Sequence, residues 1–408
     1  MLQNRGFAIG PSCRTAASGT GELPGRQRQP GWLVVGAVAR NSGKTEFACA
    51  IIKEFRRTHP VVGVKVTAIT EGKSVCPRGG EGCGVCAAFE GDFHIDEETG
   101  EQPDKDTARM LASGASRVFW IRCRRQGIGA ALKALAPRLG PGTLVVAESN
   151  SLARAIEPDL LLMVKDARGS SVKASAADVM PLAHRVVVST GGAFDMSPRR
   201  HLAVVGGSWH LVEASAAILA GGRSSRMGQD KSLLPVNGTP LIHRIHDQLL
   251  DRFDDILIST NDPDRYAFLG ARTIRDRVHG NGPLMGIASA VDTARHDRVF
   301  VTACDIPVID PDTVVRMLVL AEDCDCVIPL SSTGHEPLFA VYRKRVVPAM
   351  REALAAGERR VSTVFPLVRT RVFPLGHAPW YRNLNTADDM TAFLEASAWA
   401  GKRPTDAP

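Results

Sequence analysis

The sequence predicts an α/β protein with two domains, and three observations lead to this prediction. The chain has 408 residues, more than one ordinary domain usually holds. Short apolar runs rich in Val and Ile alternate with helical patterns in both halves, which is typical of parallel sheets. A Gly-rich stretch at 191–213 separates the halves, and we interpret it as the linker between domains 31–190 and 214–400.

The first 30 residues are predicted to be disordered. They are rich in Gly, Ser, Arg and Gln, with Glu22 as the only acidic residue, and they lack the apolar core of a secretory signal. Strands and helices then alternate. The expected strands are Trp32–Val35, Val61–Ala68, Arg117–Cys123, Thr143–Ala147, Leu160–Lys165 and Arg185–Ser189, and the expected helices are Thr45–Thr58, Asp106–Ser113 and Gly129–Leu139.

The second half repeats this alternation, so a second mainly parallel sheet is expected. Its expected strands are Ala216–Leu219, Asp255–Thr260, Arg272–Arg275, Arg298–Ala303 and Cys326–Pro329.

Charge and composition favour small anionic ligands. The formal net charge is +7 and the pI is near 9.0. Basic residues are scattered and aromatic residues make up only 5%, so no nucleic-acid-binding face is expected. No apolar run reaches the ~18–20 residues that would span a membrane. We therefore expect a cytoplasmic protein that binds phosphorylated small molecules.

Nine cysteines, an odd number without an export signal, argue against a disulfide framework. Cys76, Cys83 and Cys86 form a C-x6-C-x2-C cluster. With Cys123 or His94 as a fourth ligand, this spacing would suit zinc or part of an iron–sulfur cluster. An unliganded cysteine-rich loop is the alternative, and the sequence leaves both open.

The most informative segment of the second half is a Gly-rich turn that leaves the apolar strand Ala216–Leu219. Glycines there expose backbone N–H groups to phosphate oxygens, and Arg226 and Lys231 add positive charge at the same place. Asp305 follows another apolar strand and should lie at the carboxyl edge of the sheet, where it would hold Mg²⁺ on the phosphates. The alternatives are a turn-capping role for Asp305 and a solvated surface position for Lys231.

Several motifs of this half resemble the molybdenum cofactor guanylyltransferases, the MobA family. The resemblance runs roughly from Ala214 to Phe393 and implies a Rossmann-like nucleotidyltransferase fold. It also implies transfer of GMP from GTP to the phosphate of molybdenum-molybdopterin, with release of pyrophosphate. The motifs are LAGGRSSRMGQDKSLLPVNGTPLIHR, Thr260-Asn261-Asp262, Asp276, Gly282–Gly286, Ala303–Pro307, Glu336–Ala340 and Asn383–Thr386.

The same resemblance assigns expected roles to single residues. Lys231 would bind the phosphates, and Asp305 would hold Mg²⁺. Independently of the resemblance, the charges of Lys231 and Arg226 would stabilise the leaving pyrophosphate. Asn261 and Asp276 would contact the nucleoside. The residues expected to lie along the nucleotide are Leu219, Ala220 and Gly221.

The choice of base depends on one position of the turn. Related cytidylyltransferases and many sugar-phosphate nucleotidyltransferases carry Leu-Ala-Ala-Gly, whereas this chain carries Leu219-Ala220-Gly221-Gly222. A glycine leaves more room for a purine, which favours guanine. A cytidylyltransferase, a sugar-phosphate nucleotidyltransferase and a non-catalytic cofactor carrier stay open as alternatives.

Gly43-Lys44-Thr45 in the first half follows an apolar strand and opens a helix, as in a phosphate-binding P-loop. Lys44 would contact the β- and γ-phosphates and the Thr45 hydroxyl would bind Mg²⁺. Val38 replaces the first glycine of the motif, while Asn41 tolerates positive φ better than most residues. An ordinary Ser-Gly turn before a helix is the alternative.

Further motifs of this half resemble the MobB family, small GTP-binding P-loop partners of the guanylyltransferase. Glu148 matches a carboxylate near the metal in that family. The resemblance implies a fusion of a P-loop NTPase-like accessory domain with the transferase, acting with molybdopterin-insertion proteins and molybdoenzyme chaperones. Val38, the cysteine-rich insertion and Glu148–Asn150 depart from the family pattern, so GTP hydrolysis and a pure docking role both stay open. The motifs are Gly91–Asp96, Asp104–Arg109 and Ala112–Ala115.

Overall fold

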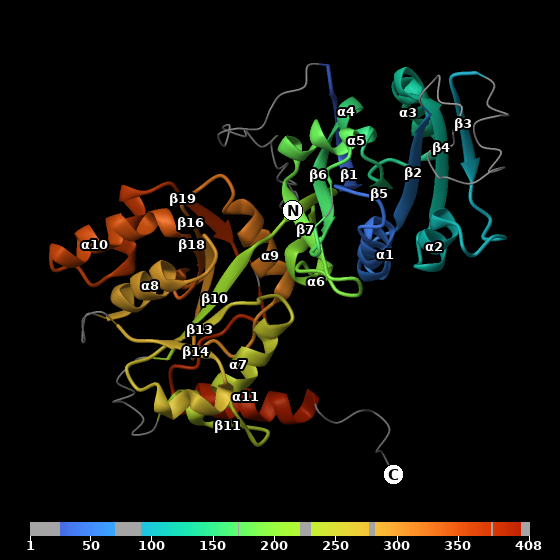
Figure 1. The fold of residues 1–408 in the computed structure, drawn as a ribbon. Coiled ribbons are helices and arrows are strands. Elements are labelled where there is room, and N and C mark those ends of the chain that lie inside the picture. The colour runs from blue at the N-terminus through green and yellow to red at the C-terminus, as the bar shows by residue number, and fades with distance from the viewer. Residues whose placement is uncertain are drawn as a thin grey trace, which may run out of the picture. The chain divides into compact units, whose positions relative to one another are not determined.

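The structure is a computed structural model that describes residues 25–69, 91–169, 171–220, 230–276, 282–376 and 378–400. Internal contacts divide the chain into two units, the first ending at Leu211 and the second beginning at Val212 (Figure 1). Both units are α/β, as the sequence predicts.

The first unit is built on a seven-stranded sheet in the order β3-β4-β2-β5-β1-β6-β7. The paired strands are parallel except for β3, which runs antiparallel to β4. β1 thus lies in the interior of the sheet, between β5 and β6. The strands are β1 (Gln27–Ala37), β2 (Val61–Ile69), β3 (Phe93–Glu97), β4 (Arg117–Arg124), β5 (Leu144–Glu148), β6 (Ile156–Asp166) and β7 (Arg185–Ser189).

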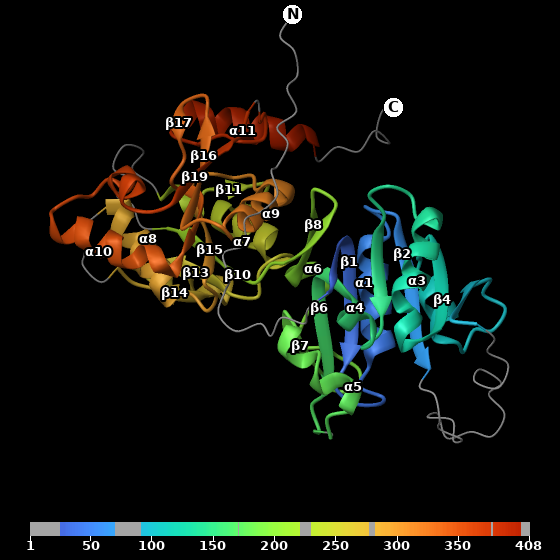
Figure 2. The ribbon, with the colours of Figure 1, turned by 90° about the horizontal axis from the view of Figure 1, so that it is seen from above.

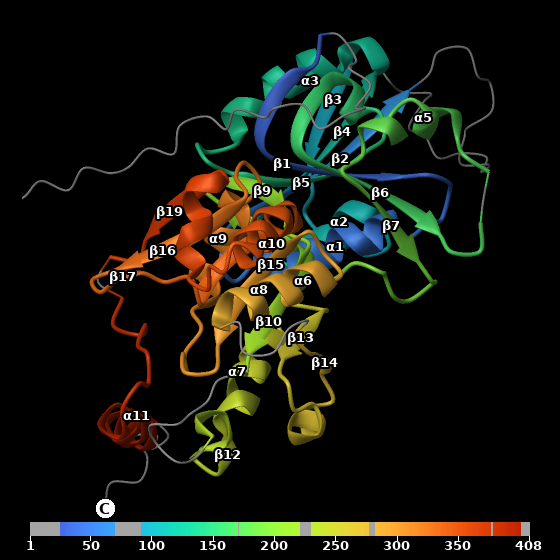
Figure 3. The same ribbon diagram turned by 90° about the vertical axis from the view of Figure 1, so that its left-hand side faces the viewer.

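Helices cover both faces of this sheet (Figure 3). Alternation along β1 sends Leu33 and Val35 to the core that contains α1, and Trp32 and Val34 to the core that contains α3. The helices of the first unit are α1 (Lys44–Phe55), α2 (Asp106–Ala112), α3 (Ile128–Leu135), α4 (Leu152–Ala155), α5 (Ala174–Ala177) and α6 (Pro198–His201).

Both margins of the first unit differ from the sequence-based expectation. β1 begins at Gln27, inside the stretch expected to be disordered, because Gln27–Gln29 pair with Ile156–Pro158 of β6. The expected linker 191–213 carries α6 and the hairpin β8 (Leu202–Val205) and β9 (Ser208–Leu211).

Trp209 explains why this hairpin belongs to the first unit. Its side chain is buried in the core beside α1, with its ring 4.9 Å from that of Phe55. The indole Nε1 donates a hydrogen bond to the carbonyl of Gly31 at 3.0 Å, and the Trp209 amide donates to Asp159 at 3.0 Å. Burial of this large aromatic ring stabilises the packing of the hairpin on the first unit. The segment 202–211 is therefore part of that unit and not a linker.

Replacing Trp209 by Phe is expected to lower the free energy of unfolding of the first unit by about 1–2 kcal/mol, since the Gly31 carbonyl loses its partner. Chemical denaturation followed by circular dichroism measures this. Trp120, whose Nε1 donates to the Thr67 hydroxyl at 3.0 Å in a half-buried position, provides the matched control. Equal stability of the Trp209→Phe variant and the wild-type protein would contradict the role of this hydrogen bond.

The second unit has a mixed sheet in the order β14-β13-β10-β15-β18-β16-β17, with β19 paired to β16. The strands β14, β13, β10 and β15 are parallel, whereas β18 runs antiparallel to β15 and β16. The strands are β10 (Ala214–Leu219), β11 (Pro235–Val236), β12 (Thr239–Pro240), β13 (Ile256–Ser259), β14 (Arg272–Ile274), β15 (Arg298–Ala303), β16 (Cys326–Ser331), β17 (Gly334–His335), β18 (Phe339–Arg343) and β19 (Thr370–Pro374).

α8 and α10 pack on one face of this sheet and share a hydrophobic core with it, whereas α7 and α9 contact the strands from the other face (Figure 2). None of the helices in the described part of the chain is long and apolar enough to cross a membrane. The helices of the second unit are α7 (Leu241–Leu250), α8 (Gly282–Thr293), α9 (Pro311–Leu320), α10 (Val347–Ala355) and α11 (Ala387–Ala400).

Candidate nucleotide sites

The turn between β1 and α1 has the backbone of an anion-binding loop. Gly43 precedes the helix with φ 84° and Asn41 has φ 55°, so two residues of the turn are left-handed. Alternation of such residues points successive N–H groups toward one place, next to the N-terminus of a twelve-residue helix. The reciprocal hydrogen bonds between Asn150 and Ala37, at 2.7 and 2.8 Å, hold the end of β1.

Glu148, the last residue of β5, connects the expected P-loop residues. Its carboxylate is buried, accepts a hydrogen bond from the Thr45 hydroxyl at 2.8 Å and forms an ion pair with Lys44 at 2.8 Å. Lys65 lies 3.5 Å away on β2. Burial opposes ionisation of Glu148, but Lys44 and Lys65 outweigh it, so its pKa is lowered. Glu148 is therefore an anion at neutral pH, next to the Thr45 hydroxyl.

A cavity of about 1090 Å³ opens at the carboxyl ends of β1, β2, β5, β6 and β7 and contains the whole turn. It is also lined by Asp106, which belongs to the MobB-like motif Asp104–Arg109, and by Lys65 and Lys173, which the sequence analysis did not select. Lys65 forms an ion pair with Asp106 across the cavity floor. A lysine inside the otherwise apolar strand Val61–Ile69 was the available signal, since buried lysines need a partner.

In the second unit, four parallel strands end at one level. Leu219 of β10 pairs with Ser259 of β13 and with Ala303 of β15, and Ser259 pairs with Ile274 of β14. The residues that follow these strands are therefore neighbours at the carboxyl edge. Among them are the predicted site residues Ala220, Asn261, Asp276 and Asp305.

Asn261 and Asp276 hold each other in place. The Asn261 amide donates to the Asp276 carboxylate at 3.3 Å, and the Asp276 backbone N–H donates to the Asn261 side-chain oxygen at 3.2 Å. A Cβ at Gly286 of α8 would lie 3.6 Å from the Asp276 carboxylate, so the helix passes close to the pair. The pair presents acceptor and donor groups to a ligand with little freedom to move.

Asp305 and Lys231 both contact the segment that leads into α11. The Leu384 amide donates to the Asp305 carbonyl at 2.8 Å, while the Lys231 ammonium donates to the carbonyls of Leu384 and Asn385, both at 2.8 Å. Burial raises the pKa of Asp305, Glu336 adds to this, and Lys231 opposes it. A carboxylate in such surroundings gains from a bound cation.

Some predicted residues lie outside the described part of the chain: Gly221, Arg226, Cys76, Cys83 and Cys86. Within the described ranges, no group of three or more His, Cys, Asp or Glu side chains is arranged to hold a metal ion. Of the proposed fourth cysteine-cluster ligands, Cys123 is buried, which raises its thiol pKa to about 11, and His94 contacts Asp96 at 2.8 Å. The cysteine cluster therefore stays a prediction.

The family described as MobA-like NTP transferase domain matches residues 216–369. The chain is 38% identical over 159 residues to the probable molybdenum cofactor guanylyltransferase of Pelotomaculum thermopropionicum, which covers 39% of this chain and 78% of that protein. This chain belongs to the MobA-like NTP transferase family. The probable molybdenum cofactor guanylyltransferase of Carboxydothermus hydrogenoformans is 34% identical over 189 residues, covering 44% of this chain and 95% of that protein.

Among solved structures, molybdopterin-guanine dinucleotide biosynthesis protein A of Archaeoglobus fulgidus matches 45% of this chain and 99% of its own, with 22% identity and a TM-score of 0.40. The family match lies within the second unit, which is therefore a nucleotidyltransferase domain, here called the MobA-like domain. The resemblance of the first unit to the MobB family stays a prediction.

Tyr266 is a residue of the MobA-like domain that the sequence analysis missed. It is buried, and its hydroxyl lies 3.3 Å from the Ala220 carbonyl, 3.1 Å from the Asp230 carboxylate and 2.9 Å from the Ser232 hydroxyl. Burial raises its pKa to about 12, so it stays protonated. Tyr266 thus links the two residues that flank the Gly-rich segment 221–229. No local pattern marks a tyrosine in the 3-10 turn Asp264–Leu269 for this role.

Replacing Tyr266 by Phe is expected to lower the free energy of unfolding by about 1–2 kcal/mol, because Ala220 and Asp230 lose a buried partner. We also expect slower nucleotidyl transfer, since the two ends of the segment are no longer joined. Denaturation and a pyrophosphate-release assay measure the two effects. Phe268→Leu, at an exposed position of the same turn, is the control. Unchanged stability together with unchanged transfer would contradict this role.

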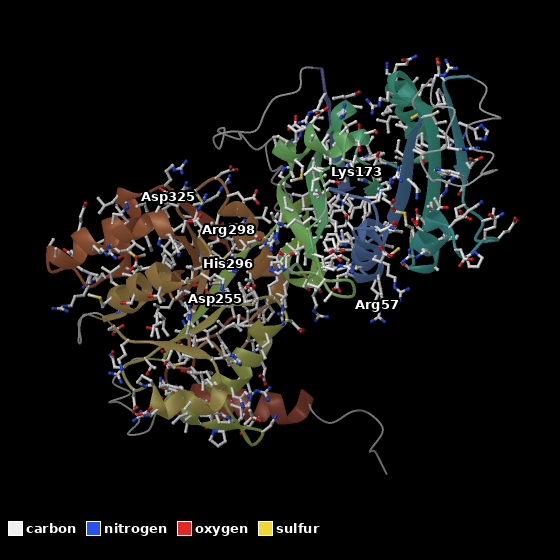
Figure 4. The ribbon with its side chains drawn as sticks, in the orientation of Figure 1. Arg57, Lys173, Asp255, His296, Arg298 and Asp325 are labelled. Atoms are coloured by element: carbon white, nitrogen blue, oxygen red, sulfur yellow. The ribbon has the colours of Figure 1, made fainter. Side chains whose placement is uncertain are left out.

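A smaller cavity of about 420 Å³ lies in the same domain near the amino end of β15, where Figure 4 labels Arg298. Its charges pair with one another: Arg298 with Glu322 at 3.3 Å, and Arg343 with Asp297 at 2.6 Å. We assign no ligand to it. Its lining residues are Glu213, Arg295, His296, Asp297, Arg298, Glu322 and Arg343.

Proposed function

We propose that the MobA-like domain transfers GMP from GTP to molybdenum-molybdopterin, forming the molybdopterin guanine dinucleotide cofactor and releasing pyrophosphate. The observation that carries the proposal is the gathering of Asn261, Asp276, Asp305 and Lys231 around one sheet edge. This arrangement occurs in a domain whose relatives are named molybdenum cofactor guanylyltransferases. Parallel sheets bind ligands at this edge.

In the proposed reaction, a terminal phosphate oxygen of the acceptor attacks the α-phosphorus of GTP. A new P–O–P bond forms, the bond between the α-phosphorus and the bridging oxygen breaks, and pyrophosphate leaves with the electron pair. No protein nucleophile is needed, so the domain contributes position and charge. Asn261 and Asp276 would bind the nucleoside, with Leu219, Ala220 and Gly221 along it.

Lys231 and Arg226 would neutralise the leaving pyrophosphate. Lys231 would exchange one of its two carbonyl partners for a phosphate oxygen, which keeps it anchored at the segment that also binds Asp305. The Asp305 carboxylate fits Mg²⁺, a cation that prefers oxygen ligands and relieves the penalty of burying an anion. When bound, Mg²⁺ would supply charge neutralisation on the phosphates.

We further propose that the first unit binds GTP and Mg²⁺ as an accessory domain. Gly43 and Lys44 would bind the phosphates, and Thr45 with Glu148 would hold the ion. The left-handed turn, the cavity around it and the ionised Glu148 beside the Thr45 hydroxyl support this assignment. Molybdopterin-insertion proteins and molybdoenzyme chaperones are the proposed partners, and the cytoplasm the proposed compartment.

The first experiment measures pyrophosphate release and product mass with purified protein, Mg²⁺ and molybdenum-molybdopterin, comparing GTP with CTP. A GMP adduct with GTP alone is the expected result. Transfer from CTP would instead assign a cytidylyltransferase. No transfer from either nucleotide would favour a sugar-phosphate nucleotidyltransferase or a cofactor carrier.

The second experiment tests the first unit by calorimetric titration with GTP. The wild-type chain is expected to bind GTP in both units, and Lys44→Ala to lose one of these sites, because Lys44 is the ammonium of the turn. Lys133→Ala on α3, remote from the cavity lining, is the control. Identical stoichiometry in the wild-type protein and Lys44→Ala would remove the first unit from the proposal.

A further inference from the structure

Three cationic side chains gather around the β1–α1 turn of the first unit. Arg40 and Lys44 belong to the turn, and Lys173 comes from the segment between β6 and α5; all three line the cavity of about 1090 Å³. The Lys173 amide donates to the Val38 carbonyl at 3.0 Å, which fixes this segment on the first residue after β1. Figure 4 labels Lys173 in the first unit.

The positive charge of this cluster is not balanced by nearby carboxylates. Within the described ranges, Lys44 pairs with one carboxylate, Glu148, which also lies 3.5 Å from Lys65. In the part of the chain that the structure describes, neither the Arg40 guanidinium nor the Lys173 ammonium has an ion-pair or hydrogen-bond partner. Lys44 and Lys173 are half-buried and Arg40 is exposed, and the three cations share a single carboxylate. The excess positive charge favours an anionic ligand.

Arg168, a further cation of the cavity, is bound differently. Its guanidinium makes a two-pronged contact with Asp166, at 2.8 and 3.0 Å, and this lowers the pKa of Asp166 to about 2. Arg168 is therefore neutralised within its own turn, whereas Lys173 is not. The difference selects Lys173 as the cation of this loop that can accept a ligand.

We propose that Lys173 is a second phosphate-binding lysine of the first unit. From the β6–α5 loop, it binds the same phosphate chain that Lys44 binds from the β1–α1 turn. The inference rests on the proposed nucleotide site of this unit and extends it. The ligand class is a nucleoside triphosphate, because cations on two sides of the turn match a chain of several phosphates better than a single one.

The electrostatics of the cavity agree with this role. Burial lowers the pKa of Lys173, and repulsion from Lys44 and Arg40 lowers it further, while Glu148 only partly compensates. A phosphate chain between these groups would turn this repulsion into attraction. Lys173 therefore gains more from the ligand than a solvated lysine would.

The test is a calorimetric titration of the full-length chain with GTP and GDP. The relevant site is the one that Lys44→Ala removes, which separates it from the site of the MobA-like domain. Lys173→Gln is expected to weaken GTP binding at this site about 10- to 100-fold, and Lys173→Arg to restore most of it. GDP binding should weaken less, because a shorter phosphate chain contacts fewer cations. Lys53→Gln, at an exposed position of α1, is the matched control.

Two results would overturn the inference in distinguishable ways. If Lys173→Gln binds GTP as tightly as the wild-type protein, with an equal melting temperature, Lys173 is not a phosphate ligand although the site exists. If the wild-type chain has no GTP site that Lys44→Ala removes, the proposed function of the first unit is wrong and the role of Lys173 is rejected with it. Equal weakening by Lys173→Gln and Lys173→Arg would point to the shape of the loop rather than to charge, and would also reject the inference.

Discussion

Replacing Asp305 by Asn is expected to slow pyrophosphate release by about 10³-fold, because the loss of the carboxylate removes the proposed hold on Mg²⁺, which is worth several kcal/mol of charge stabilisation. The substitution nearly preserves shape, and the contact between the Leu384 amide and the Asp305 carbonyl involves only the backbone. A pyrophosphate-release assay with GTP and Mg²⁺ measures the effect. Asp323→Asn, at an exposed turn after α9, is the control.

The same substitution is expected to raise the melting temperature at neutral pH. The folded-state pKa of Asp305 is raised, first by burial and then by Glu336. The folded protein therefore holds this proton more tightly than the unfolded chain does, so stability is greatest below the unfolded pKa of about 3.9 and is lost as the pH rises through the raised value. Asn carries no charge and avoids this loss. A gain in melting temperature near pH 7 that vanishes near pH 4 is expected.

The two results together distinguish a functional carboxylate from a structural one. A slower and more stable Asp305→Asn variant shows that Asp305 is maintained for its charge. A variant that is both slower and less stable would instead make Asp305 a residue that supports the edge of the sheet. Full activity with the wild-type melting temperature would exclude Asp305 from the reaction.

The placement of Asp305 was predictable because the rule involved is local. An apolar strand, Arg298–Ala303, precedes it, and a parallel strand delivers the following residue to the carboxyl edge. Glu148 follows β5 in the same way. The bounds of β7 and β15 are the expected Arg185–Ser189 and Arg298–Ala303, because a run of apolar residues in the sequence marks each strand.

The hydrogen bonds that hold Lys231 were not predictable from local patterns. Its ammonium binds the carbonyl of Leu384, a residue 153 positions away, and no periodicity in the sequence reports such a pair. Tyr266 presents the same problem, since its three hydroxyl partners come from segments that the fold alone brings together. The motifs predicted which residues form the site, whereas the contacts that hold those residues depend on the whole domain.

The hairpin β8–β9 shows a different kind of error. Gly206 and Gly207 have φ 61° and 77°, as the two central residues of a type I′ turn require, and they lie between Leu202–Val205 and Ser208–Leu211. Two consecutive glycines fit both a linker and this turn. The apolar residues on either side, above all Trp209, were the signal for a packed hairpin.

Replacing Glu148 by Ala is expected to lower the free energy of unfolding of the first unit by about 3–5 kcal/mol, because Lys44 and Lys65 then face each other without the carboxylate that neutralises both. Glu148 is buried and also accepts the Thr45 hydrogen bond, so the change leaves Lys44 and the Thr45 hydroxyl without their carboxylate partner, whereas Lys65 keeps Asp106. Chemical denaturation of the full-length chain, followed on the transition of the first unit, measures the loss. Glu54→Ala, exposed on α1, is the control.

The dependence of this loss on pH identifies its origin. Burial disfavours the charged form of Glu148, but the two lysines lower its folded-state pKa below the unfolded value. Its contribution to stability is therefore present above the unfolded pKa of about 4.3 and is lost as the pH falls through the lowered folded value. The difference between Glu148→Ala and the wild-type protein should shrink in acid. A difference that stays constant from neutral to acidic pH would assign the loss to packing and would contradict an ionised Glu148 at the centre of the site.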